Sequence, residues 1–165
     1  ILMLTENNNR LNRICFTGHR PEKISRKEQD IINDLKNEIL QAVNEGFSVF
    51  ISGMARGVDI WAAETVLQLR SSGLDIRLIC ACPYNGFETG WRASWQKRYN
   101  AVLNEADLVR YISEGYSKGC FQIRNEWMVD RSAKVIAVYN GEKGGTANTI
   151  KYAVKNGVPI SYIKA

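Results

Sequence analysis

Blocks of apolar residues alternate along this chain with longer stretches in which apolar residues recur at helical spacing. The short apolar blocks predict buried strands. We expect these strands at residues 13–17, 48–52, 76–82, 108–111, 135–139 and 159–163. Near-continuous apolar strands joined through helices are typical of an α/β fold with a mostly parallel sheet and helices on both faces.

Helical patterns fill the segments between these strands. The first helix is expected to open at Ser25, because Ser25 and Glu28 stand at capping-box spacing, and to end at Gly46. Its apolar residues recur every fourth position from Ile31 to Val43. Further helices are expected at about residues 59–70, 91–103, 121–131 and 146–157. Every two strands that are consecutive in the chain are therefore expected to be joined through a helix.

Length and organisation indicate one domain. The chain has 165 residues, without an internal repeat or a linker. Residues 1–12, which start without methionine and are rich in asparagine, are expected to be disordered or tag-derived, and residues 13–165 to form a Rossmann-like domain. No apolar run approaches the ~20 residues that span a bilayer, and no signal-peptide pattern is present. We therefore expect a cytoplasmic protein without a membrane partner.

The balance of charges is mildly basic, with a formal net charge of +5. This charge fits an anionic partner, and it does not decide between nucleic acid and a small molecule that carries phosphate. The four cysteines are expected to be small buried residues, and Cys80 and Cys82 are too poorly spaced for a metal-binding motif. Since His19 is the only histidine, no metal site is expected.

Glycine marks the ends of three predicted strands, where an open parallel sheet binds its ligands. The three strand-end segments are Gly18–Arg20, Gly53–Gly57 (which contains Met54 and Ala55) and Gly144–Thr146 (which contains Gly145). Each glycine alone is more typical of a turn, but three such loops on one edge favour an anion site. Arg20 and Arg56 could add bidentate bonds to phosphate oxygens. Neither a Walker loop nor a GxGxxG fingerprint is present, which argues against an ordinary ATPase or NAD dehydrogenase.

The combination of motifs resembles a known family. Thr17–Pro21, Ser52–Asp59, Arg124–Asp130 and Gly144–Thr146 look like segments of the YpsA-like family of bacterial and phage proteins. That family belongs to the SLOG superfamily of Rossmann-like nucleotide-binding domains. The superfamily includes the LOG enzymes, which cleave the base from nucleoside monophosphates, and the DNA-processing protein DprA. The resemblance covers residues 13–163 and implies a nucleotide-binding cleft.

Two of these segments are similar to particular members of the superfamily. Ser52–Asp59 is similar to the glycine motif of DprA, and Arg124 with Met128 matches the RKxxM spacing of the LOG enzymes, with Asn125 in place of the lysine. Gly145-Thr146 resembles the end of the LOG motif PGGxGTxxE, but Thr149 stands where the catalytic glutamate is expected. Glycosidic cleavage needs a carboxylate to stabilise positive charge on the sugar. The remaining catalytic candidates are Glu88, Arg124, Glu126 and Asp130.

Several polar and aromatic residues have a structural interpretation beside a functional one. His19 follows the first glycine and could contact the ligand, whereas Asp59 could cap the second helix or face the cleft. Tyr84 and Phe87 lie in a loop at a strand end and are candidates for stacking on a base. The stripe of Trp91, Trp95 and Tyr99 is more typical of core or of a homodimer interface.

The preferred hypothesis is that the protein binds or senses a nucleotide or an ADP-ribose-like ligand, with no certain cofactor. The expected ligand-binding residues are Gly18, His19, Arg20, Gly53, Met54, Ala55, Arg56, Gly57, Asp59, Tyr84, Arg124, Asn125, Gly144, Gly145 and Thr146. Two alternatives remain: a nucleotide N-glycosidase, and a binder of single-stranded DNA in the manner of DprA.

Overall fold

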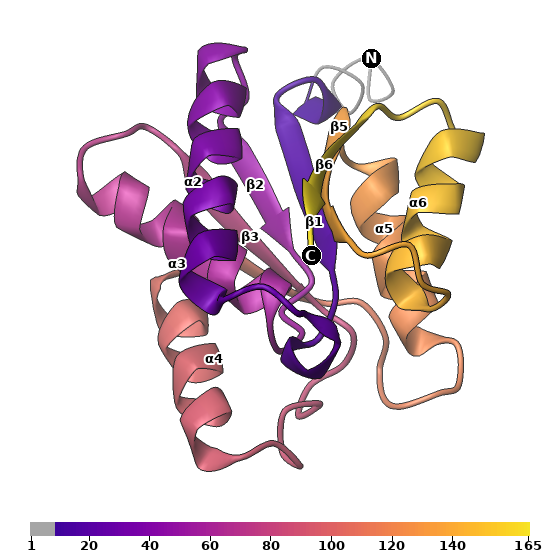
Figure 1. The fold of residues 1–165 in the computed structure, drawn as a ribbon. Coiled ribbons are helices and arrows are strands. Elements are labelled where there is room, and N and C mark those ends of the chain that lie inside the picture. The colour runs from indigo at the N-terminus through magenta and orange to yellow at the C-terminus, as the bar shows by residue number, and fades with distance from the viewer. Residues whose placement is uncertain (1–8) are drawn as a thin grey trace.

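A computed structural model describes residues 9–165 and shows a sheet between two layers of helices (Figure 1). The strands are β1 (Arg13–Gly18), β2 (Val49–Ser52), β3 (Arg77–Cys82), β4 (Leu108–Tyr111), β5 (Lys134–Tyr139) and β6 (Ile160–Lys164). The helices are α2 (Glu28–Asn44), α3 (Val58–Ser71), α4 (Ala93–Glu105), α5 (Cys120–Asp130) and α6 (Gly145–Lys155), with a short 3₁₀ helix at Pro21–Lys23. The predicted α/β, Rossmann-like fold is confirmed.

The order in which strands are added to the sheet reverses beside β1. Its order is β4-β3-β2-β1-β5-β6, and all neighbouring strands pair in parallel. Successive strands from β1 to β4 are therefore added on one side of β1, and β5 returns to the other side. The carboxyl ends of β1 and β5 thus form the switch point, where open α/β sheets bind ligands.

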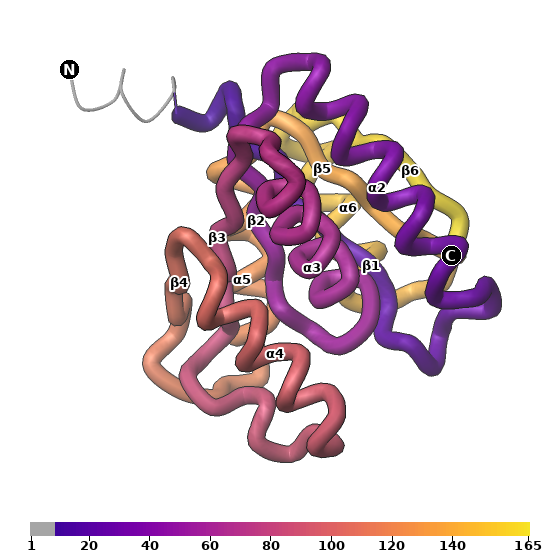
Figure 2. The backbone as a smooth tube through the Cα atoms, turned by 90° about the vertical axis from the view of Figure 1, so that its left-hand side faces the viewer, coloured from indigo at the N-terminus to yellow at the C-terminus, as the bar shows by residue number. Residues whose placement is uncertain are grey.

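Alternating strand residues separate the core into two layers. Ile14 and Phe16 of β1 pack in the larger cluster, under α2, α3 and α4. Cys15, between them, belongs to the second cluster, with buried residues of α5 and α6 such as Met128 and Ile150. Figures 1 and 2 show the corresponding helix layers on the two faces of the sheet. All four cysteines are free and buried, as their apolar surroundings predict.

Two predicted helix starts are wrong. The capping box at Ser25 and Glu28 does not form, because α2 begins at Glu28 and Lys27 occupies the N-cap without a side-chain bond. A 3₁₀ helix that begins at Pro21 occupies part of the loop before it. Trp91 lies before α4 rather than within it, since that helix begins at Ala93. The side chain of Arg10 donates to the carbonyl of Ser132, while residues 1–8 of the expected disordered segment lie outside the described residues.

Gly18 lets helix α3 approach the end of β1 closely. A Cβ atom at Gly18 would lie 2.5 Å from Cγ1 and 2.6 Å from Cβ of Val58, the first residue of α3. Because Val58 is fully buried and its Cβ is fixed to the helix, the contact cannot be relieved by a rotamer change alone. The absence of a side chain at Gly18 therefore sets the position of α3.

We predict that Gly18→Ala destabilises the protein by about 1–3 kcal/mol through overpacking against Val58. The measurement is the free energy of unfolding in urea. Gly90→Ala is the matched control, because a Cβ at Gly90 meets no atom within 4 Å. Equal stability of the two variants would contradict this account of the β1–α3 contact.

Candidate functional site

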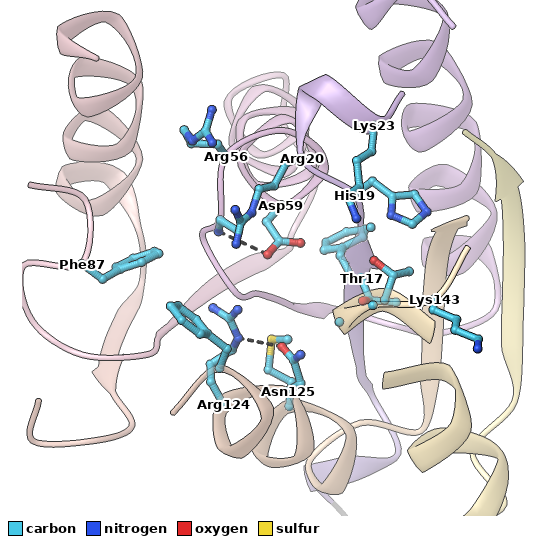
Figure 3. Close-up of a pocket in the computed structure, with 18 of the residues that line it drawn as sticks. Thr17, His19, Arg20, Lys23, Arg56, Asp59, Phe87, Arg124, Asn125 and Lys143 are labelled. Carbon is cyan, nitrogen blue, oxygen red and sulfur yellow. Dashed lines mark hydrogen bonds between the residues drawn. The ribbon is translucent and has the colours of Figure 1, made fainter. Parts of the chain in front are cut away.

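A cavity of about 380 Å³ opens at the carboxyl edge of the sheet, beside the switch point of β1 and β5 (Figure 3). It is lined by Phe16, Thr17, Gly18, His19, Arg20, Lys23, Ala55, Arg56, Asp59, Phe87, Trp91, Phe121, Arg124, Asn125, Met128, Lys143, Gly144, Gly145 and Thr146. Segments that follow β1, β2, β3 and β5, together with α5, therefore meet around one space.

Positively charged side chains line the cavity, and Figure 3 places Lys23 and Lys143 at one end of it, with Arg20 nearer to Phe87. None of Arg20, Lys23 and Lys143 has an ion-pair partner among residues 9–165. The amino end of α6 adds unpaired backbone N–H groups, since no side chain caps Gly144. Gly144 has φ 145° and ψ −163°, a conformation essentially restricted to glycine. This end of the cavity can hold an anionic group such as phosphate.

His19 joins the loops that follow β1 and β5. Its Nε2 atom accepts a hydrogen bond of 3.1 Å from the backbone N–H of Asn140, and its ring stacks on Tyr139 at 5.7 Å between centroids. Burial, and secondarily the charge of Lys23, lowers the pKa of His19 below its ordinary value. The imidazole is therefore neutral at pH 7 and fixes the geometry of the switch point while it also lines the cavity.

The turn between β2 and α3 is held by its own side chains. The hydroxyl of Ser52 donates to the carbonyl of Asp59 at 2.7 Å and accepts from the N–H of Met54 at 3.2 Å. Met54 is fully buried and has φ 63°, which a residue other than glycine rarely adopts. A Cβ at Gly57 would lie 2.7 Å from the carbonyl oxygen of His19. These contacts direct Ala55, Arg56 and Asp59 toward the cavity.

Asp59 and Arg124 approach Gly53 from two different helices. A Cβ at Gly53 would lie 2.9 Å from both Cζ of Arg124 and Oδ2 of Asp59. Both side chains are buried, with 6% of Asp59 and 5% of Arg124 exposed. The guanidinium donates to the carbonyl of Gly53 and, at 2.8 Å, to Oδ1 of Asn125. Figure 3 shows the guanidinium near the carboxylate in the lining of the cavity.

Burial changes the acid–base behaviour of this pair. It raises the pKa of Asp59 from 3.8 to about 6, although the charge of Arg124 and the N–H of Ala55 oppose the shift. Burial also lowers the pKa of Arg124, while Asp59 acts in the opposite direction. Asp59 is the only carboxylate among the residues that line the cavity. The cavity therefore contains one acid that titrates near neutral pH within a basic lining.

Aromatic rings form the opposite end of the cavity. Phe87, Trp91 and Phe121 line it, and Phe87 packs edge-on against Trp91 at 5.0 Å and against Tyr99 at 5.5 Å. Tyr84 does not line the cavity. It packs behind this end, with its ring 6.0 Å from Phe87 and 6.5 Å from Phe121. The aromatic stripe that includes Tyr99 thus supports the wall of the cavity.

A family model matches most of this chain. The model of the YspA SLOG family covers residues 14–165. The chain belongs to this family. A UPF0398 protein of Bacillus thuringiensis is 30% identical over 151 residues, which cover 86% of this chain and 82% of that protein. A UPF0398 protein of Bacillus cereus has the same identity and coverage.

Solved structures with the same fold include DNA processing protein A from two bacteria. The protein from Helicobacter pylori has a TM-score of 0.66 at 20% identity, over 98% of this chain and 68% of that one. The protein from Streptococcus pneumoniae has a TM-score of 0.65 at 20% identity, over 94% of this chain. This SLOG chain spans about half, 51%, of the length of the pneumococcal protein. At this identity the likeness concerns the fold.

The structure brings together most of the ligand-binding residues predicted from the sequence. Gly53, Met54, Gly57 and Tyr84 do not line the cavity, and they shape the elements around it instead. Sequence reasoning missed seven lining residues, which are Phe16, Thr17, Lys23, Trp91, Phe121, Met128 and Lys143. Phe121 could have been found, because it precedes Arg124 by three positions and Met128 by seven, which places all three on one helix face.

The carboxylates considered for catalysis lie elsewhere. Glu88, Glu126 and Asp130 do not line the cavity, and Asp130 accepts a hydrogen bond of 2.7 Å from the hydroxyl of Tyr152. Thr149, at the position of the LOG glutamate, is fully buried and donates to the carbonyl of Gly145 at 2.8 Å. Of the four catalytic candidates named from the sequence, which include Arg124 besides these three carboxylates, only Arg124 lines the cavity of this SLOG domain.

Residues 9–165 contain neither a metal-binding cluster nor a membrane-spanning helix. No group of three or more His, Cys, Asp or Glu side chains is arranged to hold a metal ion. No helix among these residues combines the length and the apolar character needed to cross a membrane.

We predict that the stability of Asp59→Asn relative to the wild type increases with pH. Because the folded-state pKa is raised, the contribution of Asp59 to stability is complete below the unfolded pKa of 3.8 and is lost as pH rises through about 6. A shift of about two units corresponds to roughly 3 kcal/mol.

The measurement is the difference in unfolding free energy between the two proteins at about pH 4 and about pH 7.5. Asp75→Asn, at an exposed position, is the control and should show no such trend. A difference between wild type and Asp59→Asn that stays constant with pH would be incompatible with a raised pKa.

Proposed function

We propose that this cavity binds a nucleotide or a nucleotide-derived ligand such as an ADP-ribose derivative. The observation that carries the proposal is that the two ends of the cavity differ in chemistry. Aromatic rings line one end, and Lys23, Lys143 and the amino end of α6 line the other. A nucleotide has the same division, with a planar base at one end and phosphate at the other.

The proposed orientation follows from this division. The base lies against Phe87 and Phe121, because aromatic rings stack on nucleobases. The phosphates lie at the segments that begin at Gly18 and Gly144, where Arg20, Lys23 and Lys143 neutralise their charge. Arg56 is already paired with Glu22 at 2.8 Å, so it is less available to the ligand than these three cations.

Family and fold support the general part of the proposal, that the protein binds a nucleotide or nucleic acid. The chain belongs to a SLOG family, and superfamily resemblance implies nucleotide binding. The structure of the Helicobacter pylori protein concerns its single-stranded DNA binding mode, so the same fold accommodates nucleic acid in that protein. The direct test is a thermal-shift measurement with ADP and with ADP-ribose, since a ligand selective for the native state raises the melting temperature.

We predict that Lys23→Ala and Lys143→Ala each weaken the binding of ADP about tenfold, because each removes a charge-assisted bond to phosphate. Calorimetry measures the dissociation constants. Adenosine, which lacks phosphate, should bind all variants equally. Lys36→Ala, at an exposed position of α2, is the control. Unchanged affinity of both cavity variants for ADP would place the phosphate site elsewhere.

We predict that Phe121→Ala also weakens the binding of ADP about tenfold, because stacking on one base contributes about 1–3 kcal/mol. Ribose 5-phosphate has no base and should bind this variant as it binds the wild type. Tyr162→Ala is the matched control, since Tyr162 is an exposed aromatic residue on the edge strand β6. A similar loss for both ligands would indicate a change in the cavity rather than a lost stacking contact.

The same mixtures distinguish the enzymatic alternative. Chromatography after incubation at high protein concentration, with AMP tested as an additional nucleotide, should recover intact ADP and AMP under the binding proposal. Release of adenine would instead favour nucleotide N-glycosidase activity. Asp59 would then be the residue to replace first, because it is the only carboxylate in the cavity lining.

A further inference from the structure

The carboxylate of Asp59 lies between the two ends of the cavity. Figure 3 shows Phe87 on one side of Asp59, and Lys23 and Lys143 on the other. All four residues line the same cavity. Whatever part of a ligand lies beside Asp59 must therefore connect a group at the aromatic end to a group at the basic end.

Asp59 has unused capacity to accept hydrogen bonds. An ionised carboxylate offers about four acceptor positions. Oδ2 accepts from the N–H of Ala55 at 3.2 Å, whereas Oδ1 is buried without a hydrogen-bond partner among the described residues. A buried acceptor that lacks a partner destabilises the folded protein. A ligand hydroxyl that donates to Oδ1 would supply the missing hydrogen bond.

The charge of Asp59 excludes one class of ligand group and favours another. A carboxylate repels phosphate, so the phosphates of a ligand are directed away from Asp59 toward Lys23 and Lys143. It attracts groups that donate hydrogen bonds. In a nucleotide, the hydroxyl donors belong to the sugar, which lies between base and phosphate. Dinucleotide-binding folds use the same pairing, in which an acidic side chain bonds the ribose 2′-hydroxyl, although from a different position in the chain.

Arg124 supports the ionised form of Asp59 at neutral pH. Its guanidinium is fixed by the carbonyl of Gly53 and by Asn125, so it stays beside the carboxylate. The charge of Arg124 opposes the effect of burial and limits the pKa of Asp59 to about 6. Asp59 is thus mainly ionised at pH 7.5, in the form that accepts hydroxyl hydrogen bonds and donates none.

We infer that Asp59 is a specificity-determining residue that selects ribose over 2′-deoxyribose. The cavity then accepts ribonucleotides and discriminates against deoxyribonucleotides, including a DNA strand, which offers no free 2′-hydroxyl. This inference rests on the proposed function, because it assumes that a nucleotide occupies the cavity in the orientation given above.

The test compares ADP with 2′-deoxy-ADP by calorimetry at about pH 7.5. The wild type should bind ADP about tenfold or more tightly, because one ligand hydrogen bond to a charged group is lost in the deoxy form. In Asp59→Asn the ratio of the two affinities should fall toward one, mainly through weaker binding of ADP. Asp75→Asn should keep the wild-type ratio.

Each outcome separates the inference from the proposed function. Equal affinity of the wild type for ADP and 2′-deoxy-ADP would overturn the ribose selection and leave nucleotide binding intact. A wild-type preference that persists in Asp59→Asn and in Asp59→Ser would assign the selection to another residue and overturn the inference. Failure of both ligands to bind the wild type would contradict the proposed function, and the inference would fall with it. Asp59→Asn and Asp59→Ser are independent replacements, so if one of them does not fold, the affinity ratio of the other assigns the selection.

Discussion

The buried carboxylate of Asp59 and the buried guanidinium of Arg124 both lie against Gly53, and this approach ties α3 and α5 to the end of β2. Removing two charges from water is expensive, and their attraction seldom compensates fully. The raised pKa of Asp59 shows that the compensation here is incomplete, because the carboxylate would be easier to ionise in water. The pair is therefore poorly explained as a stabilising ion pair. Under the proposed function the cavity presents both charges to a ligand, and that gives a better reason for the pair.

The local structure around the pair follows from the need to bring two helices to one strand end. Gly53 leaves room for the carboxylate and the guanidinium, and Gly18 lets the first residue of α3 contact β1. Gly57 makes the same kind of approach to the carbonyl of His19. At these three glycines the missing side chain lets other parts of the chain pack closely against the backbone. Gly144 and Gly145 differ, because they border the cavity at an uncapped helix end and can approach a ligand.

The fold was predictable from the sequence because apolar blocks and helical spacing depend on local residues alone. The edge where the glycine loops meet was predictable for a related reason, since carboxyl ends of parallel strands share one edge. The capping box at Ser25 failed because Pro21 begins a 3₁₀ helix that the local pattern did not reveal. Lys23 and Lys143 were missed because their loops show no periodicity, and only the assembled sheet, with β5 beside β1, brings these loops together. The role of Asp59 depends on Arg124, which is 65 positions away in the chain.

The position of the acid also bears on how this SLOG domain differs from the LOG enzymes that its motifs resemble. That resemblance places the catalytic glutamate one turn into the helix that follows the glycine loop of β5. Here Thr149 occupies the place, with its hydroxyl bonded to Gly145 and its side chain fully buried. The acid comes instead from α3, on the other face of the sheet from α6 (Figure 1). An acid on that side reaches the middle of the cavity, apart from the partial positive charge at the amino end of α6. Under the proposed function, the sugar and the phosphates would therefore be bound by separate walls.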